Sequence, residues 1–179
     1  MEYTLEELSY PTGKYISPQQ YSESDINRWL HKLEAAPKWY DYVIENLDED
    51  QLNTAYKPYG WTINQIIHHV ADSHMNAYIR VKMALTHDNV SILPYDQDQW
   101  ATLPDVAQVP VNISITLLHS LHRRWVALFK AITTPQFDRT YFHPEQNKSV
   151  PLWEVLSHYA WHGQHHFEQI IRLRERMSW

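Results

Sequence analysis

The sequence predicts an all-α fold, a four-helix bundle with one long crossover connection. Four segments carry apolar residues at the spacing of an amphipathic helix, and strand-like alternation is scarce. Only 3 glycines occur among 179 residues, against 8 tryptophans and 12 tyrosines, which favours long helices with aromatic packing. A chain of this length that is 44% hydrophobic is typical of one domain, so we expect residues 1–179 to form a single bundle.

The N-terminal part predicts a surface arm followed by the first helix. Residues 1–20 contain two prolines and a glycine, so we expect them to lie extended on the surface. A capping sequence at Ser22–Asp25 then precedes apolar residues at helical spacing. The first helix is therefore predicted from about Ser24 to Asn46, with a kink at Pro37.

The second helix begins in "GWTINQIIHHVADSHMNAYIRVKMALT". Gly60 ends a loop, and Thr62 with Gln65 forms a capping box. Apolar residues then alternate at intervals of four and three, the pattern of a bundle seam, and His74 lies within that seam. The apolar positions are Ile63, Ile67, Val70, Ala77, Val81 and Ala84.

The segment Ser91–Pro110 contains three prolines and no clean period, so it is predicted to be the crossover connection. Within it, "PYDQDQW" could cover a site, but we expect it mainly to pack as part of the crossover. The third helix is predicted from about Asn112 to Thr133, with His122 among its apolar residues.

The fourth helix follows "PQFDRTYFHPEQNKS", a predicted loop or short hairpin. Pro151 suits the first turn of a helix, which we expect to run to about Met177. Its apolar residues again alternate by four and three, and His166 falls in that seam.

Composition excludes several classes of function. A net charge of −6 and a pI of about 6.0 make nucleic acid an unlikely partner class. Zero cysteines exclude disulfides, cysteine-ligated zinc and a thiolate nucleophile, so any metal must use His, Asp or Glu. The sequence has neither an apolar run long enough to span a membrane nor a signal-peptide pattern, and we expect a cytoplasmic protein.

Four histidines lie close together in the fourth helix, at His158, His162, His165 and His166. At roughly 100° per residue, His162 lies about 65° from the middle of the seam that holds His166, whereas the other two lie more than about 100° away. The inward pair has the i, i+4 spacing that lets two rings reach one metal ion. The Glu of the "HExxH" metalloprotease motif is missing. Such a pair also occurs by chance, with a buried ring bonded to a carbonyl or water, so both interpretations stay open.

A third ligand must come from another helix, since two histidines do not usually close a tight site. The second helix offers His68 and His69, with His74 further along, and the third offers His119 and His122. Periodicity does not choose between His68 and His69, because both lie roughly 130° from the centre of the apolar face. His74 and His122 are better buried by pattern.

Several stretches together resemble one family. They are "GWTINQIIHHVADSHMNAYIRVKMALT", "LPYDQDQW", "LHRRWVALF", "YFHP" and "YAWHGQHHF", and they span nearly the whole chain from about Tyr10. In these stretches the sequence resembles the DinB-like superfamily, and within it the YfiT type of metal-dependent hydrolase. Agreement in both histidine segments, in order and spacing, is more specific than agreement in either one.

The resemblance implies an up-down-down-up four-helix bundle that holds one divalent ion per chain, zinc or nickel, on three histidines. Carried onto this sequence, the three are His69, His162 and His166. The family thus selects the pair that helical periodicity selects independently. The resemblance also suggests a homodimer.

The expected function is a metal-dependent hydrolase with a small-molecule substrate. An ion held by three neutral imidazoles keeps open positions, where it can activate water without a nucleophile from the protein. Candidates for orienting the ligand rings are Asp72, His74, His122 and Glu168, and no general base is assigned.

Two alternatives remain. The same open positions could bind and deprotonate an external low-molecular-weight thiol, which would make the protein a thiol S-transferase of the bacillithiol type. The second alternative is a non-catalytic metal-binding or stress-related bundle protein.

Overall fold

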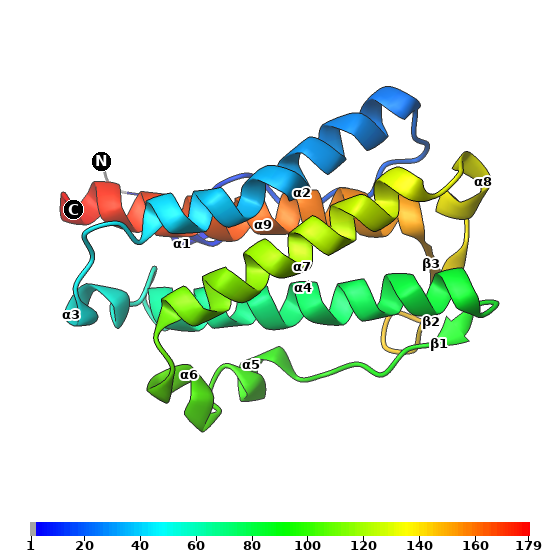
Figure 1. Ribbon diagram of the computed structural model, residues 1–179. Helices are drawn as coiled ribbons and strands as arrows, with labels where there is room; N and C mark the ends of the chain where they lie inside the picture. Colours follow the sequence, from blue (N-terminus) through cyan, green and yellow to red (C-terminus); the bar gives the residue numbers. More distant parts are fainter. Residues whose placement is uncertain (1–2) are drawn as a thin grey trace.

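The computed structural model describes residues 3–179 and shows four long helices packed side by side (Figure 1). These helices are α2 (Glu23–Val43), α4 (Ile63–Thr86), α7 (Val111–Ala131) and α9 (Leu152–Met177). Helices α2 and α9 run in one direction along the bundle, and α4 and α7 run in the other (Figure 1). Both α2 and α4 pack against α7 and α9. The predicted four-helix bundle, with its up-down-down-up order, is confirmed.

The helix ends follow their capping signals. The Ser22 and Thr62 side chains accept bonds from the backbone N–H groups of Asp25 and Gln65, and both capping boxes are complete. Helix α2 ends at Val43, three residues before the predicted Asn46, and Asn46 itself has a left-handed backbone with φ of 61°, which a right-handed helix cannot include. Helix α9 ends at the predicted Met177, but Pro151, which was expected in its first turn, is instead the N-cap residue just before it.

The predicted crossover contains two short helices, α5 (Gln97–Trp100) and α6 (Pro104–Gln108), where an irregular connection was expected. Asp96 caps the first, and Pro104 opens the second. The N-terminal arm likewise carries a short helix, α1 (Leu5–Ser9), capped by Thr4 and Glu7. Two further short helices lie between the long ones, α3 (Glu49–Leu52) and α8 (Thr134–Phe137).

A small sheet accompanies the helices in the described residues. The predicted hairpin is confirmed as β2 (Thr140–His143) paired antiparallel with β3 (Lys148–Pro151). The strand β1 (Val90–Ser91), at the start of the crossover, pairs parallel with β2. The sheet therefore ties the end of α4 to the start of α9 at one end of the bundle (Figure 1).

The core consists of two apolar clusters, one toward each end of the bundle. One contains Trp125, Phe129 and Leu156, and the other contains Tyr40, Ile67 and Ile170 among further residues. A layer of buried histidines on α4, α7 and α9 lies near the place where the two clusters meet, with His74 between them on α4 and His162 and His166 between them on α9. No helix within residues 3–179 has the length and apolar character needed to cross a membrane.

The contribution of the capping box at the start of α4 to the stability of the protein can be tested directly. Replacing Thr62 with Ala removes its bond to the Gln65 backbone, at 3.1 Å, and should lower the free energy of unfolding by about 1 kcal/mol. Urea unfolding followed by circular dichroism measures the change. The control is Thr116→Ala, in which an exposed threonine bonds to a carbonyl inside α7, and a change within about 0.5 kcal/mol is expected. Equal effects in the two variants would contradict the capping role.

Candidate metal centre

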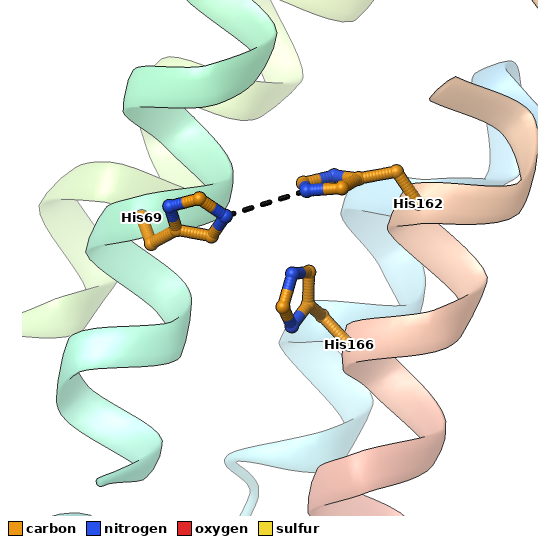
Figure 2. A group of neighbouring side chains, drawn as sticks. All are labelled: His69, His162 and His166. Atoms are coloured by element: carbon orange, nitrogen blue, oxygen red, sulfur yellow. Dashed lines mark hydrogen bonds between the residues drawn. The ribbon is translucent and has the colours of Figure 1, made fainter. Parts of the chain in front are cut away.

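Three histidines from two helices meet in the histidine layer (Figure 2). His69 comes from α4, and His162 and His166 come from successive turns of α9. Each can offer one ring nitrogen so that all three atoms lie within 4.8 Å of one another. The residues are 4%, 8% and 9% exposed, so the cluster is buried. The i, i+4 pair predicted to point inward does so, and α4 supplies the third ring.

The donor atoms suit a divalent metal ion. The Nε2 atoms of His69 and His162 are 3.3 Å apart. Two imidazole nitrogens that bind one zinc ion at about 2.0 to 2.1 Å, at the tetrahedral angle, would be separated by about 3.3 Å. Imidazole is a ligand for zinc, nickel and copper more than for the hard ions calcium and magnesium. The cluster therefore fits a transition-metal ion in its chemistry, and the His69–His162 pair also fits in its spacing.

A row of hydrogen bonds decides which nitrogen of His162 is free. The Leu33 carbonyl can only accept, so His122 Nδ1, 2.6 Å away, must carry a proton. His122 Nε2 then accepts from His74 Nδ1 at 2.8 Å, and His74 Nε2 accepts from His162 Nδ1 at 3.0 Å. In a row of neutral rings, His162 Nε2 is left with its lone pair, on the side that faces His69.

His69 differs from His162 in having no comparable partner. Among the described residues, only the contact with His162 involves a ring nitrogen of His69 in a hydrogen bond. That contact is a hydrogen bond when His69 Nε2 carries the proton, and it becomes a pair of converging lone pairs when the proton lies on Nδ1. The ring is held instead by packing, because the Trp61 ring lies 4.5 Å from it between centroids.

Burial keeps these rings neutral. It holds the pKa of His74, His162 and His166 well below the usual value, and neighbouring histidines lower the pKa further. Burial lowers the pKa of His69 and of His122 to about 4. At neutral pH the cluster therefore presents uncharged imidazoles, the form that binds metal.

The cluster opens into a cavity of about 410 Å³. Its wall is largely aromatic and carries two charged groups, Lys57 and Asp98. Gln97 and Asp98 belong to the crossover, so the segment "PYDQDQW" does contribute to the covering of the site. A larger groove of about 920 Å³ lies between α3, α6 and the starts of α4 and α7, but none of the three histidines lines it. The aromatic residues of the cavity are Tyr10, Tyr56, Tyr59, Trp61 and Trp161.

The other candidate histidines lie outside the three-ring cluster. His68 contacts Ser114 Oγ at 2.8 Å and the Val109 carbonyl at 3.0 Å, so it is turned toward the crossover and α7. His119 lies on the surface, 2.6 Å from the Asp41 carboxylate. His74 and His122 form the row of hydrogen bonds that ends at His162, and their role in orienting a metal ligand stays a prediction.

The two carboxylates proposed to orient the rings lie outside the hydrogen bonds that the described rings make. Within residues 3–179, neither Asp72 nor Glu168 makes a side-chain hydrogen bond to a histidine ring, and their role stays a prediction. Burial, reinforced by the charge of Asp105, raises the pKa of Asp72 to about 6.

Sequence reasoning missed two contributors to the site. His165 was expected to point away from the core, but it is only 6% exposed because residues of the N-terminal arm cover it. Gln169 was also missed, although it contacts His166 Nδ1 at 2.8 Å. Its position three residues after His166, on the same helix face, was the available signal.

The structure defines the class of four-helix bundles with a buried histidine cluster that could hold a metal ion, and comparison with known sequences identifies the family. The family profile of the DinB superfamily matches residues 32–170. The chain belongs to the DinB superfamily, as the resemblance in its sequence predicted.

Relatives agree over nearly the full length. Proteins of Bacillus mycoides (strain KBAB4) and Bacillus cereus (strain 03BB102), provisionally named metal-dependent hydrolases, are each 41% identical over 175 residues, which is 98% of this chain and 100% of theirs. The solved structure of YfiT from Bacillus subtilis, described as a probable metal-dependent hydrolase with an unusual four-helix bundle topology, superposes with a TM-score of 0.94. It is 39% identical, over 97% of this chain and 99% of YfiT.

The lowered histidine pKa values predict a stability that depends on pH. Burial puts the folded-state pKa of His69 and His122 at about 4, below an unfolded-state value of about 6.5. The unfolded chain therefore binds more protons between these values, so stability is fully present above pH 6.5 and is lost as pH falls toward 4. For these two residues together, the loss between pH 7 and 5 should be about 2 to 4 kcal/mol.

Urea unfolding with a chelator present, at pH 8, 7, 6 and 5, measures this dependence. The surface variant His119→Gln should follow the same curve as the wild type, because the buried rings are unchanged. A free energy of unfolding that stays constant from pH 7 to 5 would contradict the assignment of neutral buried histidines.

Proposed function

We propose that the protein is a metal-dependent hydrolase in which His69, His162 and His166 hold one zinc or nickel ion. The observation that carries the proposal is the 3.3 Å separation of two Nε2 atoms within a buried cluster of three rings that opens into a cavity. The provisional names of relatives that match over nearly the whole chain support the same class of activity.

Other residues of the chain would orient the histidine rings that hold the ion. The row through His74 and His122 keeps a proton on His162 Nδ1 and the lone pair on Nε2, toward the cluster. When bound, a divalent ion at such a site lowers the pKa of a water molecule and polarises a carbonyl group. No nucleophile from the protein is then required, which is consistent with the absence of cysteine.

The cavity supports a small-molecule substrate. Its volume, about 410 Å³, falls within the range of roughly 300 to 1,000 Å³ that is usual for small-ligand sites. Its aromatic walls would pack against an apolar portion of the substrate, while Lys57 and Asp98 would contact polar groups.

A thiol S-transferase is the second candidate function. Two observations favour it, namely the open cavity beside the three histidines and the lack of any cysteine in the chain. A thiol in this site would have to come from a low-molecular-weight compound, and the cavity would have to hold it together with an electrophile.

Oligomeric state and location stay predictions. A homodimer is consistent with two apolar side chains one turn apart on α7, Ile113 and Leu117, which are 54% and 40% exposed. A cytoplasmic location is consistent with the absence of cysteine.

Metal content tests the proposed ligands. Plasma mass spectrometry of untagged protein should find about one divalent ion per chain in the wild type, and a loss of most of it in His69→Ala, His162→Ala and His166→Ala. The controls are His119→Ala on the surface and His68→Ala, whose ring is bonded to Ser114 and Val109. Thermal melts exclude loss by unfolding. Full occupancy in all three cluster variants, or an absence of metal from the wild type, would overturn the site.

Reactivity separates the two chemical functions. A hydrolase should cleave nitrophenyl esters or small amides without any thiol, lose turnover with chelator and regain it with zinc or nickel. A thiol transferase should instead consume an electrophile only when a cellular thiol is added. A metal-loaded protein that accelerates neither reaction would favour the non-catalytic bundle.

A further inference from the structure

Gln169 lies at the centre of a second hydrogen-bond network, separate from the row behind His162. It is 3% exposed and sits on α9 one turn after His165 and His166. Its Oε1 is 2.8 Å from His166 Nδ1. Its amide nitrogen is 3.2 Å from the Ser9 carbonyl and 3.1 Å from His165 Nε2. Every polar atom of the buried amide therefore has a partner.

The Ser9 carbonyl fixes the orientation of this amide. A carbonyl oxygen only accepts, so the amide nitrogen of Gln169 must face it. Because the amide is planar, Oε1 then faces His166 Nδ1, and that ring nitrogen must donate. A neutral His166 is thereby left with its lone pair on Nε2. In the reversed orientation, the amide oxygen of Gln169 would face the Ser9 carbonyl oxygen, and neither atom could donate. The amide nitrogen would then donate to His166 Nδ1, so the proton of His166 would lie on Nε2 and that nitrogen could not bind a metal.

We infer that Gln169, oriented by the Ser9 carbonyl, is a positioning residue that selects the metal-binding tautomer of His166, and that the N-terminal arm is thereby part of the metal centre. The inference rests on the proposed function, because the choice of tautomer matters only if His166 must offer a lone pair to a metal ion. The tautomer itself is a property of the protein without metal.

The N-terminal arm is held in place at Ser9, the residue whose carbonyl orients the Gln169 amide. Ser9 is the last residue of α1, which packs against α9 and is capped by Thr4 and Glu7. Lys57 Nζ donates to Ser9 Oγ at 2.6 Å, which ties the arm to the loop before α4. With His165 Nε2 accepting from Gln169, its Nδ1 carries the proton and donates to Thr12 Oγ1 at 3.4 Å. The arm thus contacts the network at both ends.

The first experiment reads the tautomer directly. Long-range proton–nitrogen NMR spectra of metal-free protein with ¹⁵N-labelled histidine, at pH 8, should show His166 protonated at Nδ1. In Gln169→Leu this preference should be lost, with signal from the Nε2–H form. Gln169→Glu should keep the Nδ1–H form, because the carboxylate oxygen that faces His166 still accepts from that nitrogen, although the other oxygen no longer donates to the Ser9 carbonyl. A wild-type His166 protonated at Nε2 would overturn the inference whether or not the protein binds metal.

The second experiment measures zinc affinity by competition with a chelator. Gln169→Leu should weaken zinc binding by about 10-fold to 100-fold, the usual effect of removing a partner that orients a ligand ring. The matched control is Gln164→Leu, the same substitution on the same helix, where the side chain accepts from Lys32 at 2.8 Å. Equal zinc affinities in the wild type and both variants would overturn the role. If the wild type bound no zinc, the proposed function would fail, and the NMR result would still decide the tautomer.

Discussion

A single row of hydrogen bonds passes through all four long helices of the bundle. It starts at the Leu33 carbonyl on α2 and continues through His122 on α7 and His74 on α4 to His162 on α9. A buried neutral imidazole is satisfied only if one nitrogen donates and the other accepts, and an unpaired buried polar group costs about 1 to 3 kcal/mol. Each ring in the row therefore constrains its neighbour, and the helices can bring their apolar seams together only in a register that keeps the row intact.

Much of the fold was predictable because its signals are local. The capping boxes at Ser22 and Thr62, the position of Pro151 and the four-three spacing in α4 and α9 depend only on residues within a few turns of one another. The short pieces were less predictable. Strand β1 pairs with β2 by placing Val90 beside Tyr141, and the residues near Val90 give no sequence signal for a pairing partner so far along the chain.

The candidate site was predictable where it depends on one helix and not where it depends on contacts between segments. The angle between His162 and His166 follows from helix geometry alone. His68 and His69 could not be distinguished in that way, because what separates them is the capture of His68 by Ser114 and Val109. The family resemblance selected His69 on other grounds. The burial of His165 was missed for the same reason, since the residues that cover it lie in the N-terminal arm.

The same hydrogen bonds determine on which side of the rings chemistry can take place. His162 uses Nδ1 toward His74 in the interior, so its free Nε2 faces the opposite way, toward His69 and the cavity. His166 likewise uses Nδ1 toward Gln169, which leaves Nε2 as its free nitrogen. His69, His162 and His166 all line the cavity, so a divalent ion that they held would be accessible to a substrate there. Such an ion would supply Lewis-acid chemistry to that substrate, and the hydrogen bonds that satisfy the buried rings determine which of their nitrogens could hold it.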